Sequence, residues 1–347
     1  MSVEGLNVLG IESSCDETAA AVVADGRRVL SNVVHSQIHL HERFRGVVPE
    51  VASRSHMTRV LPVISDALAG AGVTPGGLAA IAVTNRPGMV GSLLVGIAAA
   101  KALAWSHGLP LIGVDHIQAH VHAAFMAEPA LRLPCLTLVA SGGHTALYLL
   151  HEPGRAERLG RTIDDAAGEA LDKGAALLGL PYPGGPSIQT AARQGDPRSI
   201  DLPRPMLGET SLDFSFSGLK TALLYHLRGP GLAHAMPSLS PQQVADCAAA
   251  YQAAVVDTLI RKLRRAAERV PGLRSLSIGG GVARNELLRQ RLREDSHLAR
   301  LQLVFPPLEL CSDNGAMIAG LGHHLWHERG QVDDLSLDAR ATSRSDG

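Results

Sequence analysis

Cysteine is scarce in this chain, and its four cysteines give no sign of a disulfide framework. They lie at positions 15, 135, 247 and 311 of 347 residues, and none belongs to a CxxC pair. This usage is typical of the reducing cytoplasm and argues against a secreted fold stapled by disulfides. We therefore expect a cytoplasmic protein.

Export and membrane signals are also missing. After Gly5 the chain enters an apolar, strand-like run, without the basic segment, long apolar core and small-residue cleavage site of a signal peptide. The most apolar long stretch, SLLVGIAAAKALAW, contains Lys101 and is too short to span a bilayer as an uninterrupted helix. We expect it to form a buried helix, and we expect no membrane partner.

An excess of charge is absent as well. The chain has 32 basic and 33 acidic residues, with a formal net charge of −1. This balance supplies no overall attraction for a polyanion. Any contact with nucleic acid must therefore use a local basic patch or a partner protein.

Length and patterning predict a two-domain α/β protein. A chain of 347 residues exceeds what one hydrophobic core usually holds. Short apolar runs alternate with helical patterns, which favours sheets covered by helices. The segments LNVLGIESSCDETAAAVVAD and LTLVASGGHTALYLLHE share one layout of strand, small polar turn and strand, which indicates internal duplication.

A histidine pair is the first candidate site. His116 and His120 lie four residues apart in VDHIQAHVHAAF, a spacing that places both on one face of a helix, and Asp115 is a plausible N-cap. Asp313, in CSDNGAMIAG, offers a third ligand for a metal ion 197 positions after His116. The pair alone is also compatible with packed or solvated histidines, because the chain contains 16 of them.

Three glycine-rich or small-residue turns follow apolar strands. They are the SSCD turn near the start, the turn with Gly142 and Gly143, and the turn of Gly279 to Gly281 that leads to Asn285 at a helix start. Such turns expose backbone N–H groups and can wrap phosphates or a nucleotide. Each could be an ordinary tight turn, but three in a duplicated chain favour nucleotide binding.

Two polar segments have both a structural and a functional interpretation. TIDDAAGEALDKGAALLGLPYPGGPSI concentrates acidic residues at helical spacings before a PGG turn, and LDFSFSGLKTALL alternates phenylalanine with serine. The structural alternative is a solvated, capped helix face for the first and a strand leading into a capped helix for the second.

The ordered motifs of the whole chain resemble those of a known family. These motifs are GIESSCDET, GVVPEVASRSH, PGMVGSLLVG, DHIQAHVHA, ASGGHT, TIDDAAGEALDKGAALLGLPYPGGP, LDFSFSGLKT, GGGVARN and CSDNGAMIA. In this order they resemble the tRNA N6-adenosine threonylcarbamoyltransferases, the bacterial TsaD family. The resemblance implies the fold of the actin, sugar-kinase and Hsp70 ATPase superfamily, with two related lobes and a nucleotide cleft between them.

The resemblance also implies a division of the chain. We expect an N-terminal lobe over residues 1–132 that carries the histidine ligands, and a C-terminal lobe over 133–311 that carries the substrate loops. A C-terminal helix over 312–330 would return to the N-terminal lobe, and 331–347 would form a tail.

The implied reaction is metal-assisted acyl transfer. The threonylcarbamoyl group of threonylcarbamoyl-AMP would pass to the N6 amine of the tRNA adenosine immediately 3′ of the anticodon, which forms t6A in tRNAs that read codons beginning with A. Because the donor is already activated, the protein must mainly position and polarise it. For the proton of the amine, Asp16 and Asp172 are weak candidate acceptors, and His144 is a weaker one.

Site residues follow from the resemblance residue by residue. The metal ligands fall on His116, His120 and Asp313, which suit Fe²⁺, the favoured ion, or Zn²⁺. The substrate contacts fall on Val139, Ala140, Ser141, Gly142, Gly143, Asp172, Gly185 and Asn285, with N–H donors from Ser141 to His144 facing the phosphate. The sequence departs from the family pattern at Asn85, Arg86, Gln118 and Gln189, and none of these replaces a proposed metal ligand.

The resemblance also implies partners. They are the tRNA, a paralogous subunit that pairs through the N-terminal lobe, a small P-loop ATPase and a separate enzyme that makes the adenylate. Candidate tRNA contacts are Arg43, Arg45, Arg54, His56 and Lys220, with scattered surface charge as the alternative.

Rival functions fit the sequence less well. A zincin protease needs glutamate directly after its first histidine, where this chain has Ile117. A kinase or an ATP-driven switch protein shares the fold but does not need a metal site made of two histidines and an aspartate. A scaffold without catalysis would not need the intact ligands and loops.

Overall fold

The computed structural model describes residues 5–342 except 45, 206, 207, 209, 230–234 and 236. Two compact units make up the chain. The first unit comprises Met1–Leu131, His151–Ala156 and Pro306–Gly347, and the second unit comprises Arg132–Leu150 and Glu157–Phe305. Residues 151–156 and 306–311, which we expected in the C-terminal lobe, thus belong to the first unit.

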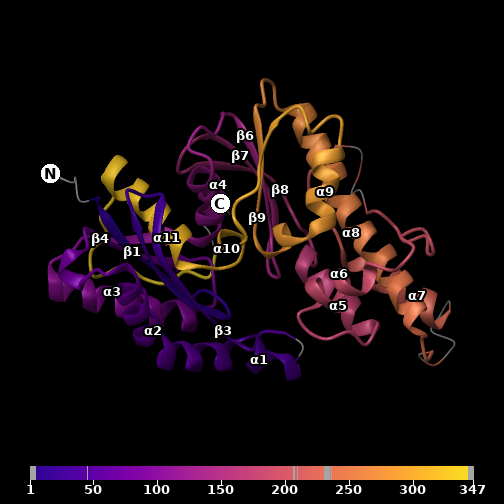
Figure 1. Cartoon of the computed structure of the whole chain (residues 1–347), viewed down its shortest axis with the longest axis horizontal. Coiled ribbons are helices and arrows are strands. Elements are labelled where there is room, and N and C mark those ends of the chain that lie inside the picture. Colours follow the sequence, from indigo (N-terminus) through magenta and orange to yellow (C-terminus); the bar gives the residue numbers. More distant parts are fainter. Residues whose placement is uncertain are drawn as a thin grey trace. The chain divides into compact units, whose positions relative to one another are not determined.

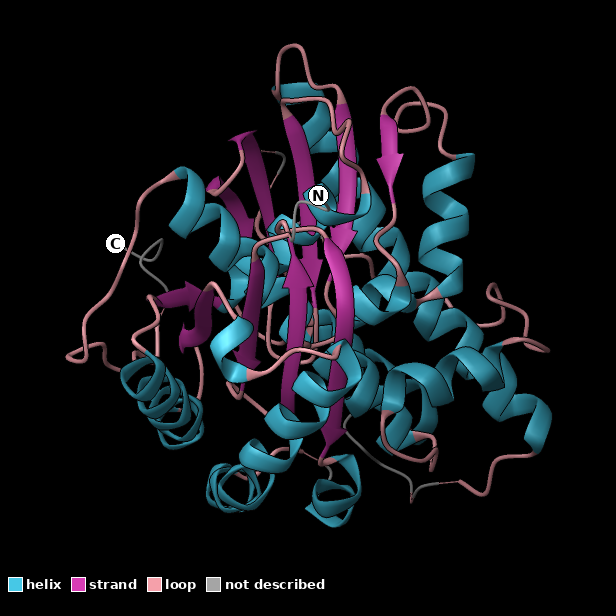
Figure 2. Cartoon of the chain, turned by 60° about the vertical axis from the view of Figure 1, so that its left-hand side comes forward, coloured by secondary structure: helices cyan, strands magenta, loops and turns pink. Residues whose placement is uncertain are grey.

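The first unit is built on a five-stranded sheet in the order β3-β2-β1-β4-β5 (Figures 1 and 2). Its strands are β1 (Asn7–Glu12), β2 (Glu17–Ala24), β3 (Arg28–Ser36), β4 (Ala80–Arg86) and β5 (Leu111–Asp115). β2 pairs antiparallel with β1 and β3, whereas β1, β4 and β5 run parallel.

Helices cover both faces of this sheet. They are α1 (Ile38–His41), α2 (Pro49–Ala71), α3 (Val90–His107), α4 (His116–Ala127), α10 (Leu308–Cys311) and α11 (Gly315–His323), with short helical turns η1 (Glu42–Phe44), η2 (Pro75–Gly77) and η5 (His324–Glu328). Leu9 and Ile11 of β1 pack in the core formed with α2 and α3, and Val8 packs in the core formed with α4 and α11. Successive side chains of a strand point to opposite faces, so a nearly all-apolar β1 serves both cores.

The second unit repeats this architecture. Its strands are β6 (Cys135–Ala140), β7 (Thr145–Glu152), β8 (Arg155–Arg161), β9 (Ser275–Gly279) and β10 (Gln302–Val304), in the order β10-β9-β6-β7-β8. β6 and β7 are antiparallel, and β6, β9 and β10 are parallel. Read from β8, this order matches that of the first sheet, and the prediction of two related α/β units is confirmed.

The helices of the second unit include one long, buried helix. They are α5 (Ala167–Leu177), α6 (Gly184–Ala192), α7 (Ser217–Arg228), α8 (Pro241–Arg269) and α9 (Glu286–Glu294), with a 3₁₀ turn η4 (Gly281–Arg284). α8 starts with a capping box in which Ser240 and Gln243 satisfy each other's backbone N–H groups. Its alanine-rich face allows neighbouring helices to approach closely, and it contacts α5, α6, α7 and α9.

Close packing of α11 on β1 depends on glycine. A Cβ atom at Gly10 would clash with the carbonyl oxygen of Gly315 and the backbone nitrogen of Ala319. The side chain of Asn314 caps α11 by accepting from the N–H of Met317 at 2.9 Å. Asp313 directly precedes this cap, so the contact of α11 with β1 fixes its position.

α3 has the length and apolar composition to cross a membrane, and it is the one such helix in the part of the chain that the structure describes. Core helices of globular proteins pass the same test. Leu93, Ile97 and Ala100 pack in the core of the first unit, whereas Leu94 and Trp105 are 45% and 76% exposed. The prediction of a buried helix therefore holds for one face of α3.

Candidate active site

The three expected metal ligands lie together in the first unit. The Nε2 atoms of His120 and His116 lie 3.1 and 3.4 Å from Oδ1 of Asp313. One ligand atom from each residue lies within 4.8 Å of the others. α4 begins at His116, directly after the N-cap Asp115, and the two rings meet edge to face with centroids 4.7 Å apart. This set of two imidazoles and one carboxylate could hold a divalent ion.

A buried glutamate that the sequence did not single out holds His116. Oε2 of Glu12, at the end of β1, lies 2.8 Å from Nδ1 of His116. The same carboxylate accepts hydrogen bonds from the backbone N–H of Ser14 and from the hydroxyl of Thr84, both at 2.5 Å. Glu12 engages Nδ1, so Nε2 is the nitrogen of His116 that faces Asp313.

Opposite charges are concentrated in this buried site. Burial disfavours the ionised form of Asp313, but His116 and His120 outweigh it and hold the pKa of Asp313 well below its usual range. Burial lowers the pKa of His116, yet Glu12 and Asp313 outweigh it and raise that pKa well above the usual value. For His120 burial dominates and lowers the pKa. The two carboxylates thus already stabilise one positive charge, which a metal ion could replace.

The turn after β1 adds further titratable groups. Burial, together with the charges of Asp16 and Asp313, raises the pKa of Glu17 well above its usual range. Burial likewise raises the pKa of the Cys15 thiol well above its usual value. Cys15 is therefore a thiol rather than a reactive thiolate, and Glu17 is an acidic residue of the site that sequence reasoning missed.

His122, the third histidine of α4, has a packing role. Its ring lies against Phe125 and His324, with centroid distances of 5.5 and 5.6 Å. Burial, with the neighbouring charges of His324 and Arg27, lowers the pKa of His122 to about 3. It is a neutral core residue outside the ligand set.

The expected substrate residues of the second unit gather at the carboxyl ends of β6 and β9. Val139 and Ala140 end β6, and Ser141 opens the following turn. Asn285 follows β9 and caps α9 by accepting from the N–H of Leu288 at 3.1 Å. Ligands of α/β sheets bind at such carboxyl ends.

Side-chain and backbone contacts join these elements into a ring. The N–H of Gly168, in α5, donates to the carbonyl of Ser141 at 3.1 Å. Oδ1 of Asp172 accepts from the N–H of Gly184, next to Gly185, at 2.6 Å. Gly280, with φ of 81°, packs directly against the backbone of Ala140 and permits no side chain there. Three of the expected residues, Ala140, Ser141 and Asp172, are therefore fixed by neighbouring elements of the same unit.

In the turn after β6, some backbone N–H groups donate hydrogen bonds within the turn itself. The N–H of Ser141 donates to the carbonyl of His144 at 2.7 Å, and the N–H of His144 donates to Oγ of Ser141 at 3.1 Å. In the described part of the chain, the N–H groups of Gly142 and Gly143 form no hydrogen bond, and both residues are exposed. The backbone N–H groups of this turn that remain available for an anion are therefore those of Gly142 and Gly143, and not all four from Ser141 to His144.

The acidic segment before the PGG turn has mainly structural contacts. Asp164 accepts from the backbone N–H groups of Phe216 and Ser217 at 2.8 and 3.3 Å and thereby caps α7. Nζ of Lys173 lies 2.5 Å from Asp165 and 3.1 Å from Glu169. The structural interpretation of both polar segments therefore accounts for these residues.

The expected RNA contacts are dispersed. Arg54 on α2 and Lys220 on α7 are exposed, in different units. Arg45 lies outside the described residues, and so does the side chain of Arg43.

His56 is a different case, because it exposes no surface. Its ring contacts the hydroxyl of Thr18 at 2.7 Å and the carbonyl of Cys15 at 2.9 Å. His56 therefore supports the turn after β1 from within the core. A side chain without exposed surface cannot contact RNA.

Two of the residues that depart from the family pattern, Asn85 and Arg86, connect helix α4, which carries both histidines, with the C-terminal tail. Nη1 of Arg86 donates to Asn85, and Nε of Arg86 lies 3.4 Å from Asp115, the N-cap of α4. Asn85 in turn donates to the carbonyl of Asp338 at 3.1 Å and accepts from the N–H of Arg340 at 2.9 Å. These residues thus tie the tail to the strand beside the site.

The other two departures lie on helices. Gln118 stands on α4 between the two histidines and is half-buried. Oε1 of Gln189, on α6, accepts from the N–H of Glu286 at 2.8 Å, in the first turn of α9. Gln189 therefore contributes a structural link between two substrate elements, which a carboxylate or an amide oxygen can make equally well.

Comparison with known proteins identifies the family. The sequence model of a family described as tRNA N6-adenosine threonylcarbamoyltransferase matches residues 28–320. The chain belongs to this family. A relative with that name from Symbiobacterium thermophilum is 52% identical over 336 residues, covering 97% of this chain and 96% of the relative. Another from Moorella thermoacetica is 52% identical over 333 residues, covering 96% and 95%.

Solved structures support the fold of this threonylcarbamoyltransferase family member. HypF of T. kodakarensis matches with a TM-score of 0.59 and 19% identity, over 94% of this chain and 48% of that chain. Component A of the (R)-2-hydroxyglutaryl-CoA dehydratase of Acidaminococcus fermentans matches with a TM-score of 0.54 and 15% identity, over 94% of this chain and all of that chain. At these identities the likeness concerns the fold alone, and it fits the actin-like ATPase fold expected from the sequence.

Proposed function

We propose that this protein transfers the threonylcarbamoyl group of threonylcarbamoyl-AMP to the N6 amine of the tRNA adenosine 3′ of the anticodon. Relatives named for tRNA N6-adenosine threonylcarbamoyl transfer, about half identical over nearly the whole chain, carry this proposal. The cluster of His116, His120 and Asp313 supports a metal-assisted form of the reaction.

The donor atoms of the first unit fit a divalent ion. Nδ1 of His116 is engaged by Glu12, which leaves Nε2 for coordination, and Asp313 is ionised beside both histidines. Three protein ligands leave coordination positions for oxygen atoms of a substrate. When bound, the ion would supply Lewis acidity toward the threonylcarbamoyl carbonyl. Fe²⁺ and Zn²⁺ both suit this donor set, and we favour Fe²⁺ from the family resemblance.

The second unit would bind the nucleotide part of the donor. The free N–H groups of Gly142 and Gly143 are suited to donate hydrogen bonds to the phosphate as negative charge develops on the leaving AMP. Asn285, Asp172 and Gly185 would contact the rest of the donor. Because Oδ1 of Asp172 already accepts from Gly184, its carboxylate has a fixed orientation.

Loss of the amine proton requires an acceptor. Asp16, half-buried in the turn after β1, is our candidate in the first unit, and Asp172 is our candidate in the second. The neighbouring Glu17 is not a candidate acceptor, because its pKa is raised well above the usual range and its carboxyl group favours the protonated form.

We further propose that the protein works in the cytoplasm with other proteins. Its four cysteines are unpaired. Leu94 and Trp105 of α3, and Met57 and Leu61 of α2, expose between 45% and 76% of their surface, which supports pairing of the first unit with a paralogous subunit. From the resemblance we expect tRNAs that read A-starting codons, a small P-loop ATPase and the enzyme that makes the adenylate as the other partners.

Reconstitution tests the proposed reaction. The full chain is combined with its partner proteins, threonylcarbamoyl-AMP, Fe²⁺ or Zn²⁺ and an unmodified tRNA, and the digested nucleosides are weighed by mass spectrometry. We expect adenosine with the added mass of threonylcarbamoyl, and its absence under every metal condition would refute the proposal.

Two ligand variants test the metal site. His120→Ala and Asp313→Ala should each lose bound metal and reduce transfer by roughly a hundredfold or more. His107→Ala, which alters an exposed histidine of α3, is the matched control and should retain both. Full transfer by a metal-free His120→Ala protein would contradict the metal role.

A further inference from the structure

Three arginines precede the three parallel strands of the second sheet. Arg132 lies before β6, Arg274 before β9 and Arg300 before β10. These strands are neighbours and run parallel, so their amino ends meet at one edge of the sheet. The substrate turns leave the opposite, carboxyl ends. The arginines therefore form a separate surface, which we call the arginine edge.

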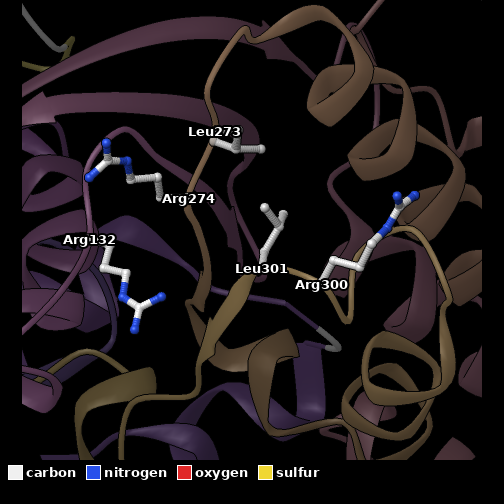
Figure 3. A pocket seen from close by; sticks show the side chains of 5 residues that line it. All are labelled: Arg132, Leu273, Arg274, Arg300 and Leu301. Atoms are coloured by element: carbon white, nitrogen blue, oxygen red, sulfur yellow. The ribbon is translucent and has the colours of Figure 1, made fainter.

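The arginine edge surrounds a surface hollow of about 440 Å³ (Figure 3). Its lining consists of the three arginines with Leu273 and Leu301. Figure 3 shows Arg132 and Arg274 on one side of the two leucines and Arg300 on the other, with the guanidinium groups pointing away from one another. Diverging cations suit an extended anion with several charges better than one small anion held at a point.

Carboxylates do not neutralise this surface. All three arginines are exposed, and within the described ranges none of their guanidinium groups forms an ion pair with a carboxylate. The contact of Arg300 is a hydrogen bond with Nδ1 of the exposed His297 at 3.3 Å. By contrast, Arg204 of the same unit lies 3.2 Å from Asp257. An anion that binds here does not have to displace a carboxylate from any of the three arginines.

The stretch of sequence that contains Arg274 and Arg300 is strongly basic in a nearly neutral chain. Residues 261–300 contain eleven arginines or lysines and four acidic residues, a net charge of +7, whereas the whole chain has −1. A local excess of this size attracts polyanions even though the protein as a whole does not.

We propose that the arginine edge binds the phosphodiester backbone of RNA at a distance from the substrate turns. This inference rests on the proposed function, which makes tRNA the substrate. Exposed, diverging arginines around two leucines can neutralise phosphates along a backbone, and because phosphate contacts carry no sequence information, we expect this contact to be independent of RNA sequence. Its role is to hold the body of the tRNA while the anticodon arm reaches the transfer site.

Salt-dependent binding of RNA tests the inference. Fluorescence anisotropy measures binding of an unmodified tRNA by the full chain with its partner proteins, in salt from about 0.05 to 0.2 M. The triple variant Arg132→Ala, Arg274→Ala and Arg300→Ala should weaken binding by roughly tenfold to a hundredfold and reduce the slope of log K against log salt by about two to three. The triple Arg→Lys variant keeps the charges and should retain most of the slope. Arg198→Ala, at an exposed arginine beside Asp196, is the matched control.

The outcomes separate this inference from the proposed function. If the triple alanine variant is folded by circular dichroism and binds tRNA with the wild-type slope, the arginine edge is not an RNA surface. If it loses binding of pyrophosphate but not of tRNA, the edge takes a small anion and the inference is also wrong. Transfer by the wild-type protein in the same preparations tests the proposed function. If transfer is observed, the proposed function remains supported even when the arginine edge fails either test.

Discussion

Two carboxylates, the buried Glu12 and the partly exposed Asp313, flank the imidazole ring of His116 on its two nitrogens. Only Asp313 is near His120 as well, so the two carboxylates have different tasks. Asp313 is placed to share an ion with both histidines, whereas Glu12 fixes the tautomer and orientation of one of them. Glu12 is therefore a positioning residue for the metal.

Replacing Glu12 should weaken the metal site without removing a ligand. Glu12→Ala should reduce metal affinity by roughly tenfold to a hundredfold, because His116 loses its hydrogen-bond acceptor. Glu12→Gln should lose less, since the amide oxygen can still accept. Titration of the metal-free protein against a competing chelator measures the affinities, and unchanged binding by Glu12→Ala would rule out this role.

Burial lowers the pKa of a lysine in α8, because it disfavours the positively charged form. Lys262 exposes no surface, and its Nζ donates to the carbonyl of Ser211 at 2.8 Å. Burial, with the charge of Arg265, lowers the pKa of Lys262 from 10.5 to about 8. The folded protein therefore accommodates its charged form at a cost in free energy.

Lys262→Met should stabilise the protein at neutral pH by about 1 to 3 kcal/mol. The carbonyl of Ser211 keeps a donor, because Nη1 of Arg265 lies 3.0 Å from it. Below pH 8 Lys262 is charged in both states and its burial cost is complete. Between about pH 8 and 10.5 only the unfolded state binds the proton, so wild-type stability rises and the advantage of the variant shrinks. Denaturant unfolding across this pH range measures the difference, and Lys220→Met, at an exposed lysine, should show no such trend.

At the scale of elements, the contact of α11 with β1 decides where Asp313 lies. The two elements are far apart in sequence, and they pack backbone to backbone at Gly10 and Gly315. Close packing of this kind leaves no room for a methyl group, since protein cores are as dense as organic crystals.

Gly10→Ala should therefore destabilise the first unit by about 3 kcal/mol, because the added methyl group pushes α11 away from β1. Asp313 would move with α11, so metal affinity should fall as well. Gly70→Ala is a suitable control, because the nearest atom to its new Cβ would be Cβ of Ser31 at 3.5 Å, and it should be neutral or slightly stabilising. Thermal unfolding and metal titration of both variants measure these effects, and equal behaviour would contradict the packing argument.

Local patterns made several of these features predictable. The four-residue spacing of His116 and His120 and the cap at Asp115 are properties of one helix, so they could be read from a short segment. The duplicated strand-turn-strand layout likewise predicted two sheets of related order. Asp313 was a candidate third ligand from its residue type, and the family resemblance supported it, because a contact across 197 positions leaves no periodic signal.

Features that depend on tertiary packing could not be predicted in this way. Glu12 ends an apolar strand, and nothing in its neighbours indicates that it faces an imidazole ring 104 residues later. His56 stands among the charged residues of α2 and resembles a surface residue, yet the turn after β1 covers it. The internal hydrogen bonds of the turn after β6 also became visible only with its backbone geometry.

At the scale of the whole molecule, the outer face of α3 is an apolar surface of the first unit that its own core leaves uncovered. Val90, Leu94 and Trp105 follow helical spacing and are 45%, 45% and 76% exposed. The inner face of the same helix is part of the core. Exposed apolar stripes of this kind are typical of protein interfaces.

Charged substitutions on this face should separate association from stability. Leu94→Asp combined with Trp105→Asp should weaken binding of the paralogous subunit at least tenfold, because large apolar side chains are typical interface anchors (about 2 kcal/mol or more each). The free energy of unfolding should change by less than about 0.5 kcal/mol, since both side chains face solvent. Analytical ultracentrifugation measures the association. Ile163→Asp, at a residue 61% exposed in the second unit, should not affect it.

The common strand order of the two units makes their positions comparable one by one. β1 and β6 both have six residues, and four residues separate each from its antiparallel partner. Glu12, the last residue of β1, then corresponds to Ala140, the last residue of β6. If both halves descend from one ancestral gene segment, the carboxylate that orients His116 was gained in one half or lost in the other at this position. The ancestral segment need not have bound a metal at all, and comparison of this one position across distant members of the superfamily would indicate when that capacity arose.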